Sequence, residues 1–110
     1  MKKIILLLLV SLSLSYSHAQ PNVRDSLNQL LQKEKSDTSR VLLLVRLSDQ
    51  YTNSKPDSAM LLALEGLALS RRIGFDKGEV EILDKIGNVY ALLGNYPKAM
   101  EVYLQELKLN

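Results

Sequence analysis

The sequence of 110 residues contains no cysteine and no tryptophan, and it has one histidine, His18, and one phenylalanine, Phe75. Without cysteine, a disulfide framework, a thiolate nucleophile and a cysteine-ligated metal site are all excluded. Three prolines and five glycines leave long uninterrupted segments. These segments are rich in leucine, alanine, lysine and glutamate, which lose little side-chain freedom in a helix, so the composition favours helices. The length allows one domain at most.

The excess positive charge is confined to the start of the chain. The formal net charge is +2, and Lys2 and Lys3 account for it, since the rest of the sequence holds twelve basic and twelve acidic residues of mixed order. A nucleic-acid-binding protein is expected to carry a basic patch or stripe. None is present in the pattern, which argues against nucleic acid as a partner.

The first twenty residues have the pattern of an export signal. A short positive start precedes an apolar run over residues 4–10, and the small residues Ser17 and Ala19 fit the groove of a signal peptidase. We therefore predict a signal peptide over residues 1–19, cleaved after Ala19, and a periplasmic location. The apolar run is shorter than the about twenty residues of a membrane-spanning helix. Membrane contact is expected only through this segment, where an uncleaved anchor is the alternative, or through a span outside the chain.

Beyond the predicted signal, apolar residues recur at helical spacing, and five helices are expected. They run from residue 23 to about 35, from about 38 to 52, from about 56 to 72, from about 79 to 93 and from about 97 onward. Pro56 and Pro97 suit the first position of a helix. Gly66 lies inside the third helix at a cost of about 1 kcal/mol relative to alanine, so we expect a neighbouring helix to approach closely there. Gly74 and Gly78 bracket an expected loop.

The apolar run over residues 41–45 also fits a buried strand when it is taken alone, because a short run is ambiguous. The pattern continues through Leu47 and Tyr51 at helical spacing, and no second strand is expected to pair with it. We therefore predict a helix here and an all-α fold for the whole chain after the signal.

Two of the expected helical hairpins repeat each other. Tyr51 aligns with Tyr90, 39 residues later, which is within the range of helical hairpin repeats. The second copy reads Leu83-x2-Ile86-Gly87-x2-Tyr90-x3-Gly94-x-Tyr96-x2-Ala99-x3-Tyr103. This pattern resembles a tetratricopeptide repeat over residues 79–110, although Leu83 replaces the usual tryptophan and Glu106 a small residue. Residues 38–78 form a divergent copy, with Ser48 for the glycine and Ala63 for the aromatic residue.

The resemblance implies antiparallel helical hairpins that stack into a right-handed superhelix. Residues 20–37 would form a leader and first helix, followed by the two repeats, and the connector over residues 72–78 resembles the extended variant of the family. The small residues Gly87 and Ala99 are expected where two helices of a hairpin press together. We also expect the stack to continue beyond residue 110, because the last helix carries apolar residues ready to receive another helix: Met100, Leu104, Leu107 and Leu109.

The sequence gives little support to catalysis. After the predicted cleavage no histidine or cysteine remains, which excludes Ser-His-Asp and Cys-His arrangements and most zinc sites. Neither a phosphate-binding loop nor a dinucleotide-binding glycine motif is present. Glu81 and Asp84 are three residues apart and share a helix face, which is typical of a solvated surface. We predict a non-catalytic protein without a cofactor or a metal.

By the same resemblance, the first helix of each hairpin lines a concave, partner-binding side. The candidate binding residues are Arg46, Asp49, Asn53, Asp84 and Asn88, with Ala91 beside them. Asn88 follows Gly87, where the family often carries a peptide-binding asparagine. Asp84 occupies the place of the lysine of a carboxylate clamp, which argues against a terminal carboxylate as the ligand.

Three functions follow as hypotheses. The first is an exported scaffold that binds a protein or peptide. The alternative is the N-terminal sensory segment of a membrane-bound two-component sensor histidine kinase, whose kinase domain would lie outside this chain. The third is self-association through the C-terminal helix, which would cover its apolar face.

Overall fold

The computed structural model describes residues 22–109, and within this range the chain is all-helical, as predicted. The helices are α2 (Val23–Lys33), α3 (Asp37–Tyr51), α4 (Pro56–Ile73), α5 (Asp76–Leu92) and α6 (Tyr96–Leu109). The predicted signal peptide, its cleavage site after Ala19 and the last residue lie outside the described residues. None of the described helices combines the length and the apolar character needed to cross a membrane.

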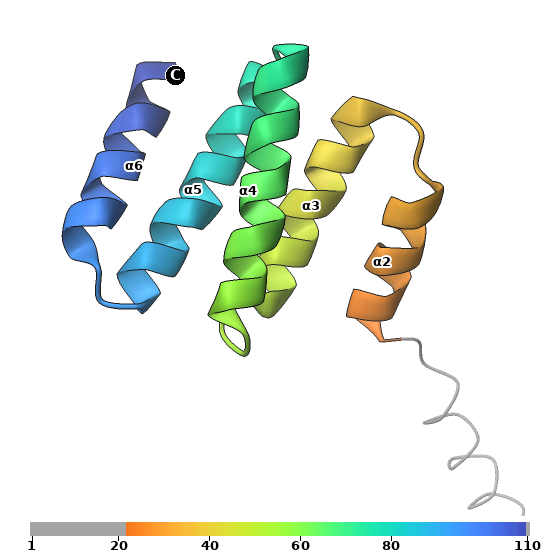
Figure 1. Ribbon diagram of the computed structural model, residues 1–110, viewed down its shortest axis with the longest axis horizontal. Coiled ribbons are helices and arrows are strands. Elements are labelled where there is room, and N and C mark those ends of the chain that lie inside the picture. The colour runs from red at the N-terminus through yellow and green to blue at the C-terminus, as the bar shows by residue number, and fades with distance from the viewer. Residues whose placement is uncertain (1–21, 110) are drawn as a thin grey trace, which may run out of the picture.

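Consecutive helices run antiparallel and lie side by side (Figure 1). Helices α3 and α4 form one hairpin, and α5 and α6 form a second. Helix α4 packs against both α3 and α5, while α3 and α5 also touch each other. The shorter helix α2 packs on α3. As a result, α3 lies between α2 and α5 on the side of the molecule away from α4.

Local signals set most helix ends where the sequence predicts them. The Asn22 side chain accepts a 2.9 Å hydrogen bond from the Arg24 amide and caps α2. Pro56 opens α4, as expected. Gly94 follows α5 with a φ of 80°, a left-handed conformation that glycine adopts without steric cost.

The connector between α4 and α5 differs from the prediction. Helix α4 ends at Ile73 and α5 begins at Asp76, so only Gly74 and Phe75 connect them. The expected loop over residues 74–78, the helix start at Glu79 and the long connector of the extended repeat variant are therefore wrong. Gly78 lies inside α5, where an added Cβ would come within 2.6 Å of Phe75 Cδ2 and 2.8 Å of Val41 Cγ1. This glycine permits a close contact rather than a turn.

The main core is shared by α3, α4, α5 and α6. Its buried members are Val41, Val45, Ala63, Ile82, Leu83, Ile86 and Val102. A second, smaller cluster joins α2 to α3 through Leu27, Leu43 and Leu47. Gly66 is buried where α4 meets both neighbours, and an added Cβ would stand 2.6 Å from Ile82 Cδ1. The close approach predicted at Gly66 is thus confirmed.

The two hairpins fill the space between their helices differently. Gly87 of α5 faces the ring of Tyr103, and an added Cβ would stand only 2.8 Å from Tyr103 Cδ1, which confirms the predicted role of Gly87. In the first hairpin, Ser48 and Ala63 hold the positions of Gly87 and Tyr103. Ser48 is fully buried, and its hydroxyl donates a 2.9 Å hydrogen bond to the Ala59 carbonyl.

Arg24 links the start of α2 to the end of α3 through three contacts. The Arg24 guanidinium lies 4.6 Å from the centroid of the Tyr51 ring, within the range of a cation–π interaction. The same guanidinium donates hydrogen bonds of 2.9 Å to the Gln50 carbonyl and 2.7 Å to Ser54 Oγ. These contacts supplement the small apolar cluster that holds α2.

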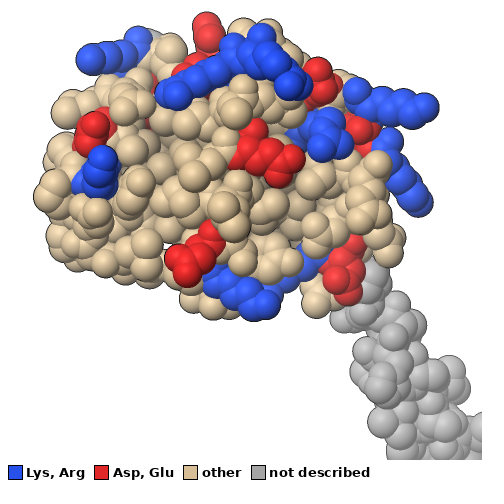
Figure 2. Space-filling view, in the orientation of Figure 1, with Lys and Arg blue, Asp and Glu red and all other residues tan. Residues whose placement is uncertain are grey.

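The outer face of α6 is apolar and exposed, as predicted. Met100, Leu104 and Leu107 are 60%, 52% and 67% exposed. Met60 and Leu67 of α4 stand forty positions before Met100 and Leu107 and occupy the equivalent places in the first hairpin. They pack against the main core, to which α5 contributes. On the side where α6 lies, the surface is largely uncharged and is interrupted by few charged side chains (Figure 2). The face of α6 thus corresponds in part to a face of α4 that is packed against the core, although Leu64, the counterpart of Leu104, is itself 47% exposed.

Candidate functional site

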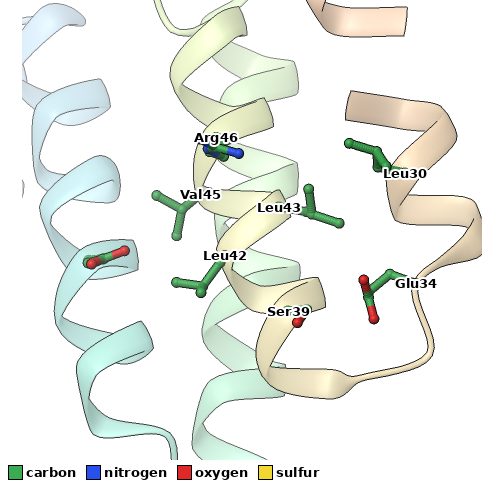
Figure 3. Close-up of a pocket in the computed structure, with 8 residues that line it drawn as sticks. Leu30, Glu34, Ser39, Leu42, Leu43, Val45 and Arg46 are labelled. Atoms are coloured by element: carbon green, nitrogen blue, oxygen red, sulfur yellow. The ribbon is translucent and has the colours of Figure 1, made fainter. Parts of the chain in front are cut away.

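Polar and apolar side chains of α3 and α5 form one face on the side away from α4. We call it the α3–α5 face and define it by Leu42, Arg46 and Asp49 of α3 and by Glu81, Asp84, Lys85 and Asn88 of α5. In α3 these residues are three or four positions apart, and in α5 Asp84 and Lys85 are each three or four positions from Glu81 and from Asn88, so they project from the same side. Figure 3 shows this side, with α3 in front and with α2 and α5 on either flank.

The larger of two hollows on this face has a volume of about 470 Å³ and lies between α2, α3 and α5. Its lining comprises Leu30, Glu34, Ser39, Leu42, Leu43, Val45, Arg46 and Glu81. Leu30 and Glu34 point from α2 toward α3, and Leu43 points back toward α2 (Figure 3). Leu30 and Leu42 remain 53% and 38% exposed. The first hollow therefore offers apolar side walls to solvent, and its charged lining residues are Glu34, Arg46 and Glu81.

A second hollow of about 250 Å³ adjoins the first, and the two share Val45 and Glu81. The other lining residues are Val80, Asp84, Lys85 and Glu106. Glu106 belongs to α6, so the second hairpin contributes both of its helices. Because three of these side chains are carboxylates and one is basic, the second hollow is the acidic end of the face.

One ion pair joins the two helices of the face. Lys85 Nζ lies 3.1 Å from Asp49 Oδ1. The Asp49 side chain is 60% exposed, and such surface pairs contribute about 0–1 kcal/mol. Within residues 22–109, no lysine or arginine forms an ion pair with Glu81, Asp84 or Glu106. The one basic side chain that lines the second hollow, Lys85, is thus paired with Asp49, and the three carboxylates of the acidic end have no ion-pair partner among these residues.

The acidic end also perturbs two groups of α6. Burial raises the pKa of the Glu106 carboxyl above its ordinary value, and the Asp84 carboxylate raises it further. Burial likewise raises the pKa of the Tyr103 hydroxyl, with added contributions from Asp84 and Glu106. Both shifts have the sign expected when negative charges are crowded together and partly withdrawn from water.

The structure places the predicted site residues unequally. Arg46 lines the first hollow and Asp84 the second. Asp49 is bound to Lys85, and the amide of Asn88 is bound to Tyr103 and Asp84. These four share the α3–α5 face. Asn53 lies in the exposed turn after α3 and lines neither hollow.

Several residues of the face were not predicted as binding residues. Lys85 could have been found, because it lies one turn from Glu81 on the helix side already considered. Leu30 and Glu34 reach the first hollow only because α2 docks on α3, and Glu106 reaches the second only through the packing of α6 on α5. These contacts between helices cannot be predicted from the spacing of residues in the sequence.

In comparisons with known proteins, no family model, no curated protein and no solved structure matches this chain. Across the described residues, no group of three or more histidine, cysteine, aspartate or glutamate side chains is arranged to hold a metal ion. The candidate site consists of an apolar hollow with accessible leucines joined to an acidic hollow.

Proposed function

We propose that this protein is an exported, non-catalytic scaffold of the tetratricopeptide type, which binds a protein or peptide segment on its α3–α5 face. One observation carries the proposal: the first hollow leaves Leu30 and Leu42 open to solvent inside a concavity lined by charged groups. Exposed apolar surface with a polar rim is typical of interaction sites. The hollow's volume is within the usual range of ligand sites, about 300–1,000 Å³.

The make-up of the face supports a segment of chain as the ligand. Three helices contribute to the first hollow, and the second hollow continues it across α5 toward α6. Such an elongated surface suits an extended or helical segment, which can place successive side chains along it. The motif over residues 79–110 supports the same function through its resemblance to a family of peptide-binding repeats.

A selection of peptides tests the proposal. Random dodecapeptides displayed on phage would be selected on the immobilised full chain, and the affinity of a synthetic, fluorophore-labelled winner would be measured by fluorescence anisotropy. We expect Leu42→Glu and Arg46→Ala to weaken binding at least about tenfold, the equivalent of 1.4 kcal/mol, and Asn88→Ala to weaken it measurably.

Two control variants make the result specific. Leu61 is 70% exposed on α4, away from the face, so Leu61→Glu adds the same charge elsewhere, and Asn53→Ala alters a predicted residue that lines neither hollow. Circular dichroism would verify that helicity is unchanged. A selection without any winner, or winners that bind the Leu42→Glu and Arg46→Ala variants as well as the wild type, contradicts the proposal.

A second candidate function is favoured by the exposed face of α6. We propose as the alternative that further helices extend this stack and that the whole serves as the sensory segment of a membrane-bound sensor histidine kinase. The correspondence between Met100 and Leu107 of α6 and the covered Met60 and Leu67 of α4 supports such an extension. The gene sequence downstream of residue 110 decides: a membrane span followed by kinase motifs is expected, and their absence rejects the alternative.

A further inference from the structure

We infer that the segment bound by the α3–α5 face carries a large apolar side chain and, about three residues away, a lysine or arginine. The inference rests on the proposed function and adds the chemistry of the ligand. It depends on three features of the face, which are its apolar hollow, the charge of the adjoining hollow and the distance between them.

The first hollow selects the apolar side chain. Leu43 and Val45 are almost fully buried beneath it, at 9% and 8% exposure, whereas Leu30 and Leu42 stand open on its sides. A leucine, methionine or phenylalanine side chain that enters would be surrounded by apolar groups from α2 and α3. Removing such a side chain from water favours binding, so this hollow is where the segment would be anchored.

The charge of the two hollows selects the second side chain. Their lining contains four carboxylates, from Glu34, Glu81, Asp84 and Glu106, against two basic groups, from Arg46 and Lys85. Lys85 is already paired with Asp49. The remaining excess is negative and is concentrated in the second hollow. A cation placed there would be attracted by Glu81, Asp84 and Glu106, whereas an acidic ligand would be repelled.

The raised pKa of Glu106 supports the same choice of ligand. Its causes are burial and the neighbouring Asp84 carboxylate, and the groups that share its hollow are Glu81 and Lys85. A ligand cation beside Glu106 would stabilise its ionised carboxylate and so counteract the repulsion from Asp84. An anion or an apolar group would aggravate at least one of the two causes.

The spacing follows from the geometry of helices and extended chains. The first hollow is lined mainly by α3 residues and the second mainly by α5 residues, and they meet at Val45 and Glu81, so the step from one to the other is that from α3 to its neighbour α5. Neighbouring helix axes lie about 8–10 Å apart, and an extended chain advances about 3.3 Å per residue. The two side chains of the ligand are therefore about three residues apart.

The test uses the full chain and the phage-displayed dodecapeptides. We expect the selected sequences to share a large apolar residue about three positions from a lysine or arginine. The best of them would be synthesised together with two analogues, in which norleucine or glutamate replaces the basic residue. We expect the norleucine analogue to bind about tenfold more weakly than the parent peptide and the glutamate analogue more weakly still.

A protein variant tests the same charge attraction from the side of the protein. The double variant Asp84→Asn with Glu106→Gln should weaken the parent peptide about tenfold and leave the norleucine analogue unaffected, because only the charge attraction is removed. Its helicity would be checked by circular dichroism. If the double variant fails to fold, the three peptides measured on the wild type still decide.

The outcomes separate this inference from the function on which it rests. Winners that lose binding to Leu42→Glu, but whose basic residue can be replaced without effect, overturn the inference and leave the proposed function intact. Winners rich in acidic residues overturn it as well. Selected peptides that bind the Leu42→Glu variant as tightly as the wild type, or a selection that yields no peptide, overturn the proposed function itself.

Discussion

Tyr103 Oη donates a 2.5 Å hydrogen bond to Asn88 Oδ1, and so ties α6 to the exposed edge of α5. Asn88 Nδ2 in turn lies 3.4 Å from Asp84 Oδ2. The amide of Asn88, one of the predicted peptide-binding residues, is thus held in place by its own hairpin. One N–H and one lone pair of this amide remain for a partner, and their direction is fixed by Tyr103.

Tyr103→Phe therefore tests the positioning of Asn88. The variant removes the hydrogen bond and keeps the ring against Gly87, so we expect a loss of about 0.5–1.5 kcal/mol in the free energy of unfolding. Peptide affinity should fall by a few-fold, because the amide of Asn88 is free to rotate. Urea denaturation and fluorescence anisotropy measure the two effects. Unchanged affinity in Tyr103→Phe and in Asn88→Ala alike would exclude this amide from the site.

Gly87→Ala should destabilise the second hairpin. The new methyl group would collide with the Tyr103 ring, and such overpacking costs about 1–3 kcal/mol, partly offset by about 1 kcal/mol of helix propensity. In a Tyr103→Ala background the collision disappears, so the same Gly87→Ala change should become stabilising. Thermal or urea denaturation of the four proteins gives the comparison. A destabilising effect of equal size in both backgrounds would show that the ring is not the cause.

Arg24→Ala should loosen α2 without unfolding the rest of the chain. Arg24 contributes the cation–π contact to Tyr51 and two hydrogen bonds to the end of α3, and a short helix gains most of its stability from such contacts. Hydrogen exchange should rise over residues 23–33 and stay unchanged in α4 to α6. Peptide affinity should also fall, because α2 carries Leu30 and Glu34. Lys33→Ala in the same helix is the matched control.

Glu106→Gln should change how stability depends on pH. The pKa of Glu106 is raised in the folded state, so the folded protein binds more protons than the unfolded chain between the two pKa values. The contribution of Glu106 to stability is therefore favourable at low pH and is lost as the pH rises through the folded-state pKa. Glu106→Gln should be more stable than the wild type at pH 7, and this advantage should vanish in acid. Urea midpoints across pH 3–8 would reveal it, and parallel curves would contradict it.

The exposed face of α6 leads us to expect self-association of two copies. Glu101 and Lys108 flank this face seven residues apart, so a two-fold axis near Leu104 brings Glu101 of one copy toward Lys108 of the other. Sedimentation velocity should show a dimer that grows with concentration and is abolished by Leu104→Glu. Leu61→Glu serves as the control, and a wild-type monomer at high concentration refutes the expectation.

Features that depend on residues close in the sequence could be predicted from it. Helical spacing located all five helices, and the predicted end of the fourth helix near residue 93 agrees with the position of Gly94 after α5, since a left-handed helix end is decided by one residue and its immediate neighbours. Gly66 and Gly87 were also interpreted correctly, because a glycine within a helix is unfavourable unless another helix comes close.

Features that depend on the packing of distant segments could not be predicted from the sequence. Gly78 resembles a turn residue, yet its smallness serves contacts with Phe75 and with Val41 of α3, 37 residues away. The first hollow exists because α2 folds back on α3, and the acidic hollow because Glu106 of α6 comes near Asp84. The sequence therefore predicted the helix faces and four residues of the α3–α5 face, but neither hollow.

The different fillings of the two hairpins mean that their helices are not interchangeable parts. If α4 were paired with α5 in place of α6, the methyl group of Ala63 would stand opposite Gly87, where the Tyr103 ring now packs. The smaller methyl group would leave a void. Placing α6 opposite α3 would force Tyr103 onto the buried hydroxyl of Ser48. A duplication that lengthens this chain during evolution would thus have to copy a hairpin as a whole, and recombination would be tolerated between hairpins rather than within them.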